Sequence, residues 1–288
     1  MNSLKFKEKQ RQYLASLLCC NPKEIEYLCQ NIQSYYKKKI ETKTNKETGE
    51  IKAYSDGTPK VRIIRPSYRR LKQIQKAIKT NILSKVILPT NIYGGVKKKS
   101  NKTNAKAHQG NKYIFATDLQ EFFPSITHKQ VFTMYLGLGY SNYIAHWLTK
   151  LTSCEFELPQ GTPTSTHIAN LVFLAIDKEL ILFCKENQIT YTRFVDDLTF
   201  SSQQDFSTLT NEILSFVTLA GFKISQRKTQ YKGKQSITGI LVFPNYIDAP
   251  QKIKEKAKQE KLNKEKPMPY NIYLESIRGS NTNMPNKK

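Results

Sequence analysis

The hydrophobic positions of the N-terminal third fall into segments of different period. Residues 1–40 repeat leucine and isoleucine at three- and four-residue spacings, which predicts two helices, the second beginning at Pro22. Residues 41–66 lose this period, and their threonines, glycines and Asp-Gly pair predict a basic β-hairpin. Helical period returns at residues 67–88 as a basic amphipathic helix. Residues 92–113 predict a loop rich in glycine and lysine.

The rest of the chain alternates strand-like and helix-like patterns. The predicted elements are a strand at 112–119, a helix from near Thr127, a long apolar helix after the Pro/Gly turn at 158–163, a hairpin at 190–202, an amphipathic helix at 205–219, a strand at 235–243 and a basic C-terminal helix. The residues after Arg278 have little to bury, so we expect a loose tail. Helices on one face of a small antiparallel sheet give an α+β fold.

Composition and charge add a preference for a polyanionic partner. The chain has 288 residues, 39% hydrophobic and 11% aromatic, which suits a folded protein of several lobes. Its formal net charge is +23, and the stretch from Lys37 to Lys112 supplies +17 of it with 21 basic and 4 acidic residues. Clustered Lys and Arg bind nucleic acid by releasing counterions from its phosphates. A lysine-rich proteome is the alternative explanation.

Cysteine usage and the N-terminal sequence indicate a cytoplasmic protein. The five cysteines form an odd set without a C-x-x-C pair, as expected of reduced, buried thiols. The N-terminal residues contain no apolar signal core, and no run approaches 18 apolar residues. The scattered His128, His146 and His167 have no ligand-spaced neighbours, so they predict no zinc site. We expect no membrane insertion.

Two adjacent carboxylates occupy the stretch TRFVDDLTFS, residues 192–201. Strands rich in β-branched and aromatic residues flank Asp196 and Asp197, which places the pair at a hairpin turn on a rigid element. An ordinary Asp-containing turn is the alternative. Asp118 closes another strand, YIFATD, and the three side chains would converge if both strands lie in one sheet. Crowded carboxylates need hard cations, and such a set suits two-metal phosphoryl transfer.

Six sequence blocks resemble the bacterial reverse transcriptases, most closely those of retron type. Four of them, FATDLQEFFPSI, LPQGTPTSTHIAN, YTRFVDDLTFS and GFKISQRKT, match the palm motifs of that family in order and spacing. Upstream, VRIIRPSYRRLKQIQ resembles the family element R-x-I-x-x-P-x-x-x-L-K-x-I-Q. NAKAH, residues 104–108, matches the N-A-x-x-H that separates retron enzymes from group II intron and retroviral relatives. The resemblance runs from about Tyr36 to Val242.

The resemblance implies a right-hand polymerase with fingers, palm and thumb. N-terminal helices and basic fingers would occupy residues 1–112. The palm, a small antiparallel sheet backed by helices, would occupy residues 113–242, with fingers-palm helices around 128–155. Residues 243–288 would form a short or truncated thumb and a tail. Because family members continue for several more helices, we expect a weaker grip on the duplex or a partner that completes the thumb.

The resemblance also assigns residues to the chemical step. Asp118, Asp196 and Asp197 would bind two Mg²⁺ ions, with Mn²⁺ as a substitute, and the backbone carbonyl of Leu119 would be a further ligand. Phe123 holds the steric-gate position, where an aromatic ring excludes a ribose 2′-hydroxyl and selects dNTPs. Its alternative is core packing beside its neighbour in the sequence.

Other assigned residues would contact the incoming nucleotide. Gln160 would lie along it, with a plain turn residue as the alternative. Arg62 would grip the triphosphate with its guanidinium fork, or Arg65 in its place, unless either is merely a surface residue. Lys228 would stand near the pyrophosphate as a general acid, and a solvated turn lysine fits equally well.

The remaining assignments concern nucleic-acid binding. Thr238 and Gly239, in SITGILV, match the retron V-T-G element and would approach the primer backbone. His108 would contact nucleic acid or brace a loop with Asn104, and we favour bracing. The candidate RNA-backbone patch consists of Lys97, Lys98 and Lys99. A solvated charge run is its alternative.

The chain departs from the family in its central motif. Phe194-Val195-Asp196-Asp197 replaces the usual Tyr-Ala-Asp-Asp, which removes a hydroxyl near the primer and narrows the space beside the nucleotide. Ile237 replaces the customary valine. Because both carboxylates remain, we expect altered efficiency or fidelity rather than inactivity.

The resemblance implies an RNA-directed DNA polymerase that copies a structured noncoding RNA into DNA from dNTPs, in anti-phage defence, with an effector protein or a partner that completes the thumb. One alternative is a defence-associated reverse transcriptase that makes DNA by untemplated or self-primed synthesis without a retron RNA. Another is an inactive palm that serves as an RNA-binding scaffold. The electrostatic cost of three clustered carboxylates disfavours the scaffold.

Overall fold

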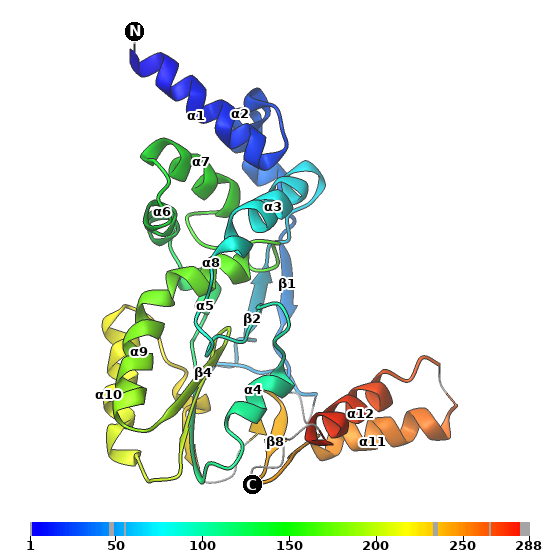
Figure 1. The fold of residues 1–288 in the computed structure, drawn as a ribbon. Coiled ribbons are helices and arrows are strands. Elements are labelled where there is room, and N and C mark those ends of the chain that lie inside the picture. The colour runs from blue at the N-terminus through cyan, green and yellow to red at the C-terminus, as the bar shows by residue number, and fades with distance from the viewer. Residues whose placement is uncertain (1, 46–48, 55, 233–235, 265, 283–288) are drawn as a thin grey trace. The chain divides into compact units, whose positions relative to one another are not determined.

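The structure is a computed structural model, and its fold is drawn in Figure 1. The chain divides into two compact units. The described residues are 2–45, 49–54, 56–232, 236–264 and 266–282. The first unit comprises Met1–Ile87 and Glu121–Phe173, and the second comprises Leu88–Gln120 and Leu174–Lys288. Within the described residues, no helix is both long and apolar enough to span a bilayer. Helices combined with small antiparallel sheets confirm the predicted α+β class.

The first unit is mainly helical. Its helices are α1 (Asn2–Leu18), α2 (Pro22–Gln30), α3 (Arg69–Asn81), α5 (Phe122–Ser125), α6 (His128–Gly137), α7 (Asn142–Thr152) and α8 (Ser165–Val172), with 3-10 helices η1 (Ile32–Tyr35) and η2 (Leu83–Lys85). Strands β1 (Lys39–Thr42) and β2 (Val61–Ile64) pair antiparallel. This unit therefore contains the N-terminal helices and the basic hairpin that the sequence predicts.

Local sequence explains where these helices begin and which face they bury. The Asn21 side chain accepts a backbone N–H hydrogen bond, and Pro22 starts α2, as predicted. Helix α3 buries Leu71 and Ile78 completely. The amphipathic helix is thus confirmed, although α3 ends at Asn81, earlier than predicted.

The two-stranded ribbon of β1 and β2 is largely solvent-exposed. Further bridges, Thr44 to Ile51 and Ala53 to Pro59, continue the pairing beyond the two strands. All side chains of both strands are exposed or half-buried. The two strands therefore present Lys39 and Arg62 to solvent.

The second unit contains two antiparallel sheets within the described residues. The larger has the order β4 (Thr190–Phe194), β5 (Asp197–Ser202), β3 (Tyr113–Asp118), β6 (Gln230–Lys232), and the smaller has the order β7 (Ser236–Ile237), β8 (Ile240–Val242), β9 (Ile247–Asp248). The helices are α4 (Asn101–Ala107), α9 (Leu174–Glu186), α10 (Thr210–Leu219), α11 (Gln251–Leu262) and α12 (Pro269–Thr282), with 3-10 helices η3 (Ser207–Leu209) and η4 (Gln226–Lys228).

The two faces of the four-stranded sheet have different surroundings. On one face, Tyr191 stacks on Phe200 with ring centroids 4.8 Å apart, and the Tyr191 hydroxyl donates to Asp177 of α9. Helix α9 packs against β4, and α10 packs against α9 (Figure 1). Because directly opposed residues share a face, Asp118 and Asp197 lie together on the other face.

Part of the loop predicted at 92–113 is helical, so that prediction is wrong for α4. A capping box between Ser100 and Thr103 begins the helix, and Asn104 and Ala105 are buried. A helix of 7 residues is too short for its period to be recognised in the sequence.

Two other predicted elements are also divided differently. The long apolar helix is two helices, α8 and α9, which separate at Phe173. The strand predicted at 235–243 is the β7–β8 hairpin, because Thr238 and Gly239 have φ of 46° and 79° and form its two-residue turn. Residue 235 lies outside the described residues.

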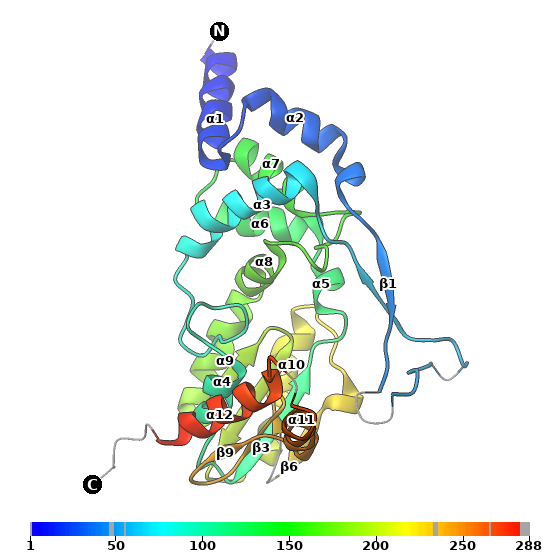
Figure 2. The same cartoon turned by 90° about the vertical axis from the view of Figure 1, so that its right-hand side faces the viewer.

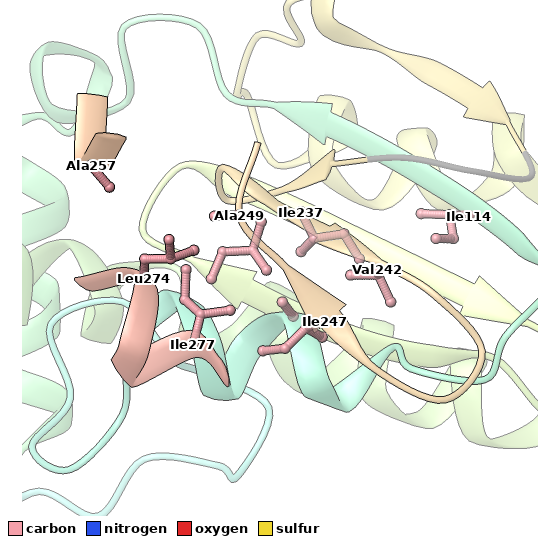
Figure 3. Packing of buried hydrophobic residues seen from close by; sticks show 10 residues of the cluster. Ile114, Ile237, Val242, Ile247, Ala249, Ala257, Leu274 and Ile277 are labelled. Atoms are coloured by element: carbon pink, nitrogen blue, oxygen red, sulfur yellow. The ribbon is translucent and has the colours of Figure 1, made fainter. Parts of the chain in front are cut away.

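The C-terminal segment shares a hydrophobic core with the smaller sheet (Figure 3). The buried residues of this core are Ala105, Ile114, Ile237, Ile240, Val242, Ile247, Ala249, Ala257, Leu274 and Ile277. Helix α12 packs against β9 and α11 (Figure 2). The buried Glu260 carboxylate accepts hydrogen bonds from the N–H groups of Tyr270 and Asn271, both at 3.0 Å. Because α12 extends to Thr282, the tail predicted to be loose after Arg278 is helical there; residues 283–288 lie outside the described residues.

Candidate active site

Strand pairing places two of the three predicted aspartates side by side. Asp118 ends β3 and is the antiparallel partner of Asp197, the first residue of β5. Opposed residues on one face have Cβ atoms about 4.5–5.5 Å apart. Asp196 lies in the β4–β5 turn, and its carbonyl oxygen accepts a hydrogen bond from the Leu119 N–H at 2.9 Å. The backbone therefore brings all three residues to one end of the sheet.

Lys228 binds the carboxylate of Asp118. Its Nζ lies 2.6 Å from one Asp118 oxygen and 2.5 Å from the other, while the Asp118 side chain is buried and the Lys228 side chain is half-exposed. The Ser225 N–H donates to the Asp118 carbonyl oxygen at 2.8 Å, which fixes the 3-10 turn that carries Lys228 beside β3. The sequence alone does not decide whether Lys228 is a catalytic lysine or a solvated turn lysine. In the structure its ammonium group forms an ion pair with Asp118.

The donor atoms at this end of the sheet suit a hard divalent ion. Within the part of the chain that the structure describes, no three carboxylate, imidazole or thiol side chains form a ready metal-binding group. The buried Asp118 carboxylate already accepts a cation, the Lys228 ammonium, at both oxygens. Carboxylate oxygens are the ligands that Mg²⁺ prefers. Asp118, Asp196 and Asp197 are the side chains that would hold it, and the ion would lower the pKa of an attacking hydroxyl.

The two arginines predicted for triphosphate binding have different surroundings in the first unit. Arg62 is exposed on β2, opposite Glu41 of β1. Arg65 is 8% exposed, and its guanidinium binds the carboxylates of Glu155, at 2.5 Å, and Glu157. Its N–H also donates to the Gln160 carbonyl oxygen at 2.8 Å. Arg65 therefore braces the turn before Gln160, whereas Arg62 is accessible.

Phe123 and Gln160 are also found in the first unit. Phe123 is half-buried, while its neighbour Phe122 is buried and packs edge-on against Phe173 at 5.7 Å. Gln160 precedes Gly161, whose φ of +100° and close approach to Ile64 leave no room for a side chain. Phe122 is thus a core residue, whereas Phe123 is partly accessible.

The predicted lysine patch contains two kinds of lysine. Lys97 and Lys98 are exposed, whereas the Lys99 ammonium donates to the carbonyl oxygens of Thr90 and Ile92. Burial lowers the pKa of Lys99. Lys97 and Lys98 therefore suit a phosphate backbone, and Lys99 secures a loop.

His108 is fully buried between α4 and the larger sheet. Its ring nitrogens lie 2.7 Å from the hydroxyls of Ser201 and Thr192. Burial lowers the pKa of His108 to about 3, so the ring is neutral. This placement supports bracing, with Ser201 and Thr192 as the partners rather than Asn104. Asn104 instead lies 3.5 Å from the hydroxyl of Thr238 in the hairpin turn that also contains Gly239.

Two residues near the aspartate turn, Arg193 and Asp177, were not predicted from the sequence. Arg193 and Asp177 form an ion pair with both side chains 0% exposed, and Gly94 lies against Val195. The available signals were Arg193 within an apolar strand and Asp177 within an apolar helix. Because unpaired charges are almost never buried, two such residues indicate a buried pair.

Comparisons of this chain with a protein family and with individual proteins indicate the same family. The family described as "Reverse transcriptase (RNA-dependent DNA polymerase)" matches residues 43–243 of this chain. The retron Ec86 reverse transcriptase of Escherichia coli is 34% identical over 191 residues, which cover 62% of this chain and 58% of that protein. The retron Mx65 reverse transcriptase of Myxococcus xanthus is 32% identical over 205 residues, 63% of this chain and 48% of that protein.

A third relative and one solved structure extend the comparison. The retron Se72 reverse transcriptase of Salmonella heidelberg is 28% identical over 242 residues, 80% of this chain and 60% of that protein. A telomerase structure from Candida albicans has a TM-score of 0.46 at 10% identity and covers 83% of this chain and 54% of that chain, a similarity too weak to support conclusions. The chain thus spans roughly half to three fifths of the length of these retron relatives. The chain belongs to the reverse transcriptase (RNA-dependent DNA polymerase) family, and its relatives are bacterial retron reverse transcriptases.

Proposed function

We propose that this chain is an RNA-directed DNA polymerase of retron type that extends a primer with dNTPs in a reaction requiring Mg²⁺. The opposed pair of Asp118 and Asp197, within the segment that matches the family, carries this proposal. Asp196 completes the acidic set from the adjoining turn. Two ions held there would activate the primer hydroxyl and stabilise the pyrophosphate leaving group.

The other predicted residues take roles consistent with their surroundings. Arg62 contacts the triphosphate, Phe123 restricts the sugar, and Gln160 lies along the nucleotide. Lys228, held beside Asp118, is available to protonate the leaving group. Thr238 and Gly239 form the turn that approaches the primer. In this proposal residues 1–112 are the N-terminal helices and basic fingers, 113–242 are the palm, and 243–288 are a short or truncated thumb and tail.

The template in this proposal is a structured noncoding RNA, and the biological setting is anti-phage defence in the cytoplasm. The charge of +23 supports a polyanionic partner. The retron relatives support the choice of an RNA template.

The test is incorporation of labelled dNTPs on a primed RNA template, with and without Mg²⁺. Wild-type protein should incorporate dNTPs only with the ion, and Asp196→Ala should lose at least about 100-fold of the rate, because one ligand of the ion is gone. Asp205→Asn is a matched control, since this exposed aspartate lies in the loop before η3 and accepts a hydrogen bond from the Tyr231 hydroxyl. It should retain wild-type activity.

Two other outcomes would change the assignment. If wild type and Asp196→Ala bind RNA equally and neither incorporates nucleotide, the chain is an RNA-binding scaffold. Incorporation without any RNA template would instead indicate the untemplated or self-primed alternative. Sequencing the nucleic acid that copurifies with the protein identifies the transcript and its DNA copy.

A further inference from the structure

Arg193 and Asp177 form a fully buried ion pair behind the aspartate turn. The Arg193 guanidinium donates from Nε to Asp177 Oδ1 at 2.9 Å and from Nη2 to Oδ2 at 2.6 Å. Both side chains are 0% exposed. Replacing such a pair by apolar residues of similar volume often leaves stability unchanged or improved. Stability alone therefore does not explain why two charges lie in this core.

The third contact of the guanidinium reaches the turn itself. Arg193 Nη1 donates to the Val195 carbonyl oxygen at 2.9 Å. Val195 has a φ of +62°, which is rare for a β-branched residue and persists only where the surroundings hold it. The carbonyl that Arg193 holds belongs to the peptide leading into Asp196.

A second segment bonds the backbone of β4 just before this turn and packs against the turn itself. The Tyr93 N–H donates to the Arg193 carbonyl oxygen at 2.8 Å, and the Arg193 N–H donates to the Asn91 carbonyl oxygen at 2.9 Å. A Cβ on Gly94 would lie 2.3 Å from the Val195 nitrogen and 2.5 Å from its Cγ2. Only glycine therefore fits at position 94 without moving the turn.

Arg193 acts from the face of the sheet opposite the aspartates. It is the antiparallel partner of Leu198, whereas Asp197 is the partner of Phe194, and successive residues alternate between faces. Its guanidinium is buried on the α9 side, where Asp177 lies. A nucleotide or ion bound at Asp118 and Asp197 would thus be on the other side of the strand, which makes Arg193 a positioning residue.

We propose that the Arg193–Asp177 pair, together with Gly94, fixes the position of Asp196 and Asp197 through the Val195 carbonyl and so sets the affinity of the site for divalent ions. This inference rests on the proposed function of the aspartates. Substituting a residue that orients a metal ligand without binding the metal itself typically changes metal affinity 10- to 100-fold.

The test compares Arg193→Lys with Tyr191→Phe. Lysine keeps the charge but lacks the fork that spans Asp177 and Val195. Tyr191→Phe removes the other hydrogen bond to the same Asp177 oxygen, at 2.8 Å, and leaves the contact to Val195 in place. Mn²⁺ binding to the protein alone, followed by the EPR signal of the free ion, gives a readout independent of activity.

Arg193→Lys should raise the Kd for Mn²⁺, and the Mg²⁺ concentration for half-maximal incorporation, about tenfold. The KM for dNTPs at saturating Mg²⁺ should change less than twofold, and Tyr191→Phe should match wild type in all three quantities. In Gly94→Ala the added Cβ would clash with Val195 and displace the turn, so this variant should weaken Mn²⁺ binding similarly. If the lysine variant fails to fold, Val195→Gly provides the test instead. Glycine makes this half-buried turn more flexible, so the protein should again bind Mn²⁺ less tightly.

Unchanged Mn²⁺ affinity in the folded variants would overturn the inference, as would an equal loss in Tyr191→Phe. Failure of the proposed function is distinguishable, because wild-type protein would then incorporate no dNTP at any Mg²⁺ concentration. The comparison of Mn²⁺ affinities would remain interpretable in that case.

Discussion

Arg62 and Arg65 are three residues apart, and their surroundings assign them different tasks. Arg62 is exposed on the ribbon, where a triphosphate has access to its guanidinium. Arg65 is 8% exposed and is already engaged by Glu155 and Glu157. A guanidinium with two carboxylate partners has little capacity left for a phosphate.

Alanine at each position should therefore give different defects. Arg62→Ala should raise the KM for dNTPs about tenfold with an unchanged melting temperature, because it removes the proposed contact with the triphosphate from an exposed position. Arg65→Ala should lower the free energy of unfolding by about 2 kcal/mol, because it leaves a partly buried carboxylate unpaired. Steady-state kinetics and urea denaturation measure the two effects. The reverse pattern would make Arg65 the triphosphate ligand.

The three consecutive lysines give a second prediction at this scale. Lys97→Gln and Lys98→Gln should each reduce the salt dependence of RNA binding by slightly less than one unit in log K against log[salt], as expected for one phosphate contact. Lys99→Gln should leave that slope unchanged and lower stability, because its ammonium holds two carbonyl oxygens. Filter binding from low to high salt tests this. Equal slopes for all three variants would mean that the whole run is solvated.

At the scale of elements, helix α4 connects parts of the second unit that are far apart in sequence. His108, at its C-terminal end, bonds the hydroxyls of Ser201 and Thr192 in the larger sheet. Asn101, at its first turn, donates to the Tyr273 hydroxyl of α12 at 2.6 Å. The segment resembling the retron N-A-x-x-H motif thus has a structural role in holding the sheet and the C-terminal helix together.

The buried His108 should make stability depend on pH. Its pKa in the folded chain, about 3, lies below the ordinary value of 6.5, so folding favours the neutral ring. This contribution is fully present above pH 6.5 and is lost as pH falls towards 3, by about 1.4 kcal/mol for each unit. Urea denaturation at pH 7.5 and pH 5 should show this loss in the wild-type protein.

His108→Gln is the matched control for this effect. Glutamine retains a donor and an acceptor for Ser201 and Thr192 but has no proton to gain in this range. The difference in stability between pH 7.5 and pH 5 should be smaller in the variant by about 2 kcal/mol. Parallel pH profiles of the two proteins would show that His108 is protonated without opening the structure.

The sequence predicts the β4–β5 hairpin and the amphipathic helix α3 because their periods are strong. Residues 190–202 alternate clearly and form the β4–β5 hairpin as predicted. The pairing of Asp118 with Asp197 depends on strand order, which period alone does not specify. Short α4 and the break at Phe173 depend on capping and tertiary packing, and neither leaves a periodic signal.

The buried partners around the site were harder to predict than the aspartates. Asp196 and Asp197 form a recognisable pair in the sequence, whereas Arg193 and Asp177 are separated and acquire meaning only when α9 packs on β4. Val195 likewise gives no sign in the sequence of its positive φ, because β-branched residues rarely adopt it. Local pattern reveals candidate ligands, while tertiary structure reveals what holds them.

At the scale of the whole molecule, both units contain buried hydrophobic residues. Ile78 is completely buried in the first unit, and Ile277 is completely buried in the core that α12 shares with the smaller sheet of the second (Figure 3). Chains built from separate compact units often open one unit at a time. The C-terminal helices should therefore open with the second unit rather than as an independent tail.

Matched substitutions in the two cores test this division. Ile277→Ala should destabilise its unit by about 2–4 kcal/mol, because removing a buried isoleucine side chain leaves a cavity, and Ile78→Ala should do the same in the first unit. In native-state hydrogen exchange, Ile277→Ala should speed exchange in β7–β9, α11 and α12 while leaving α3 and α7 at wild-type rates. Ile78→Ala should give the opposite pattern. Faster exchange throughout the chain in both variants would mean that the two cores open as one cooperative unit. Faster exchange confined to α12 in Ile277→Ala would mean that the C-terminal helix opens independently of the sheet on which it packs.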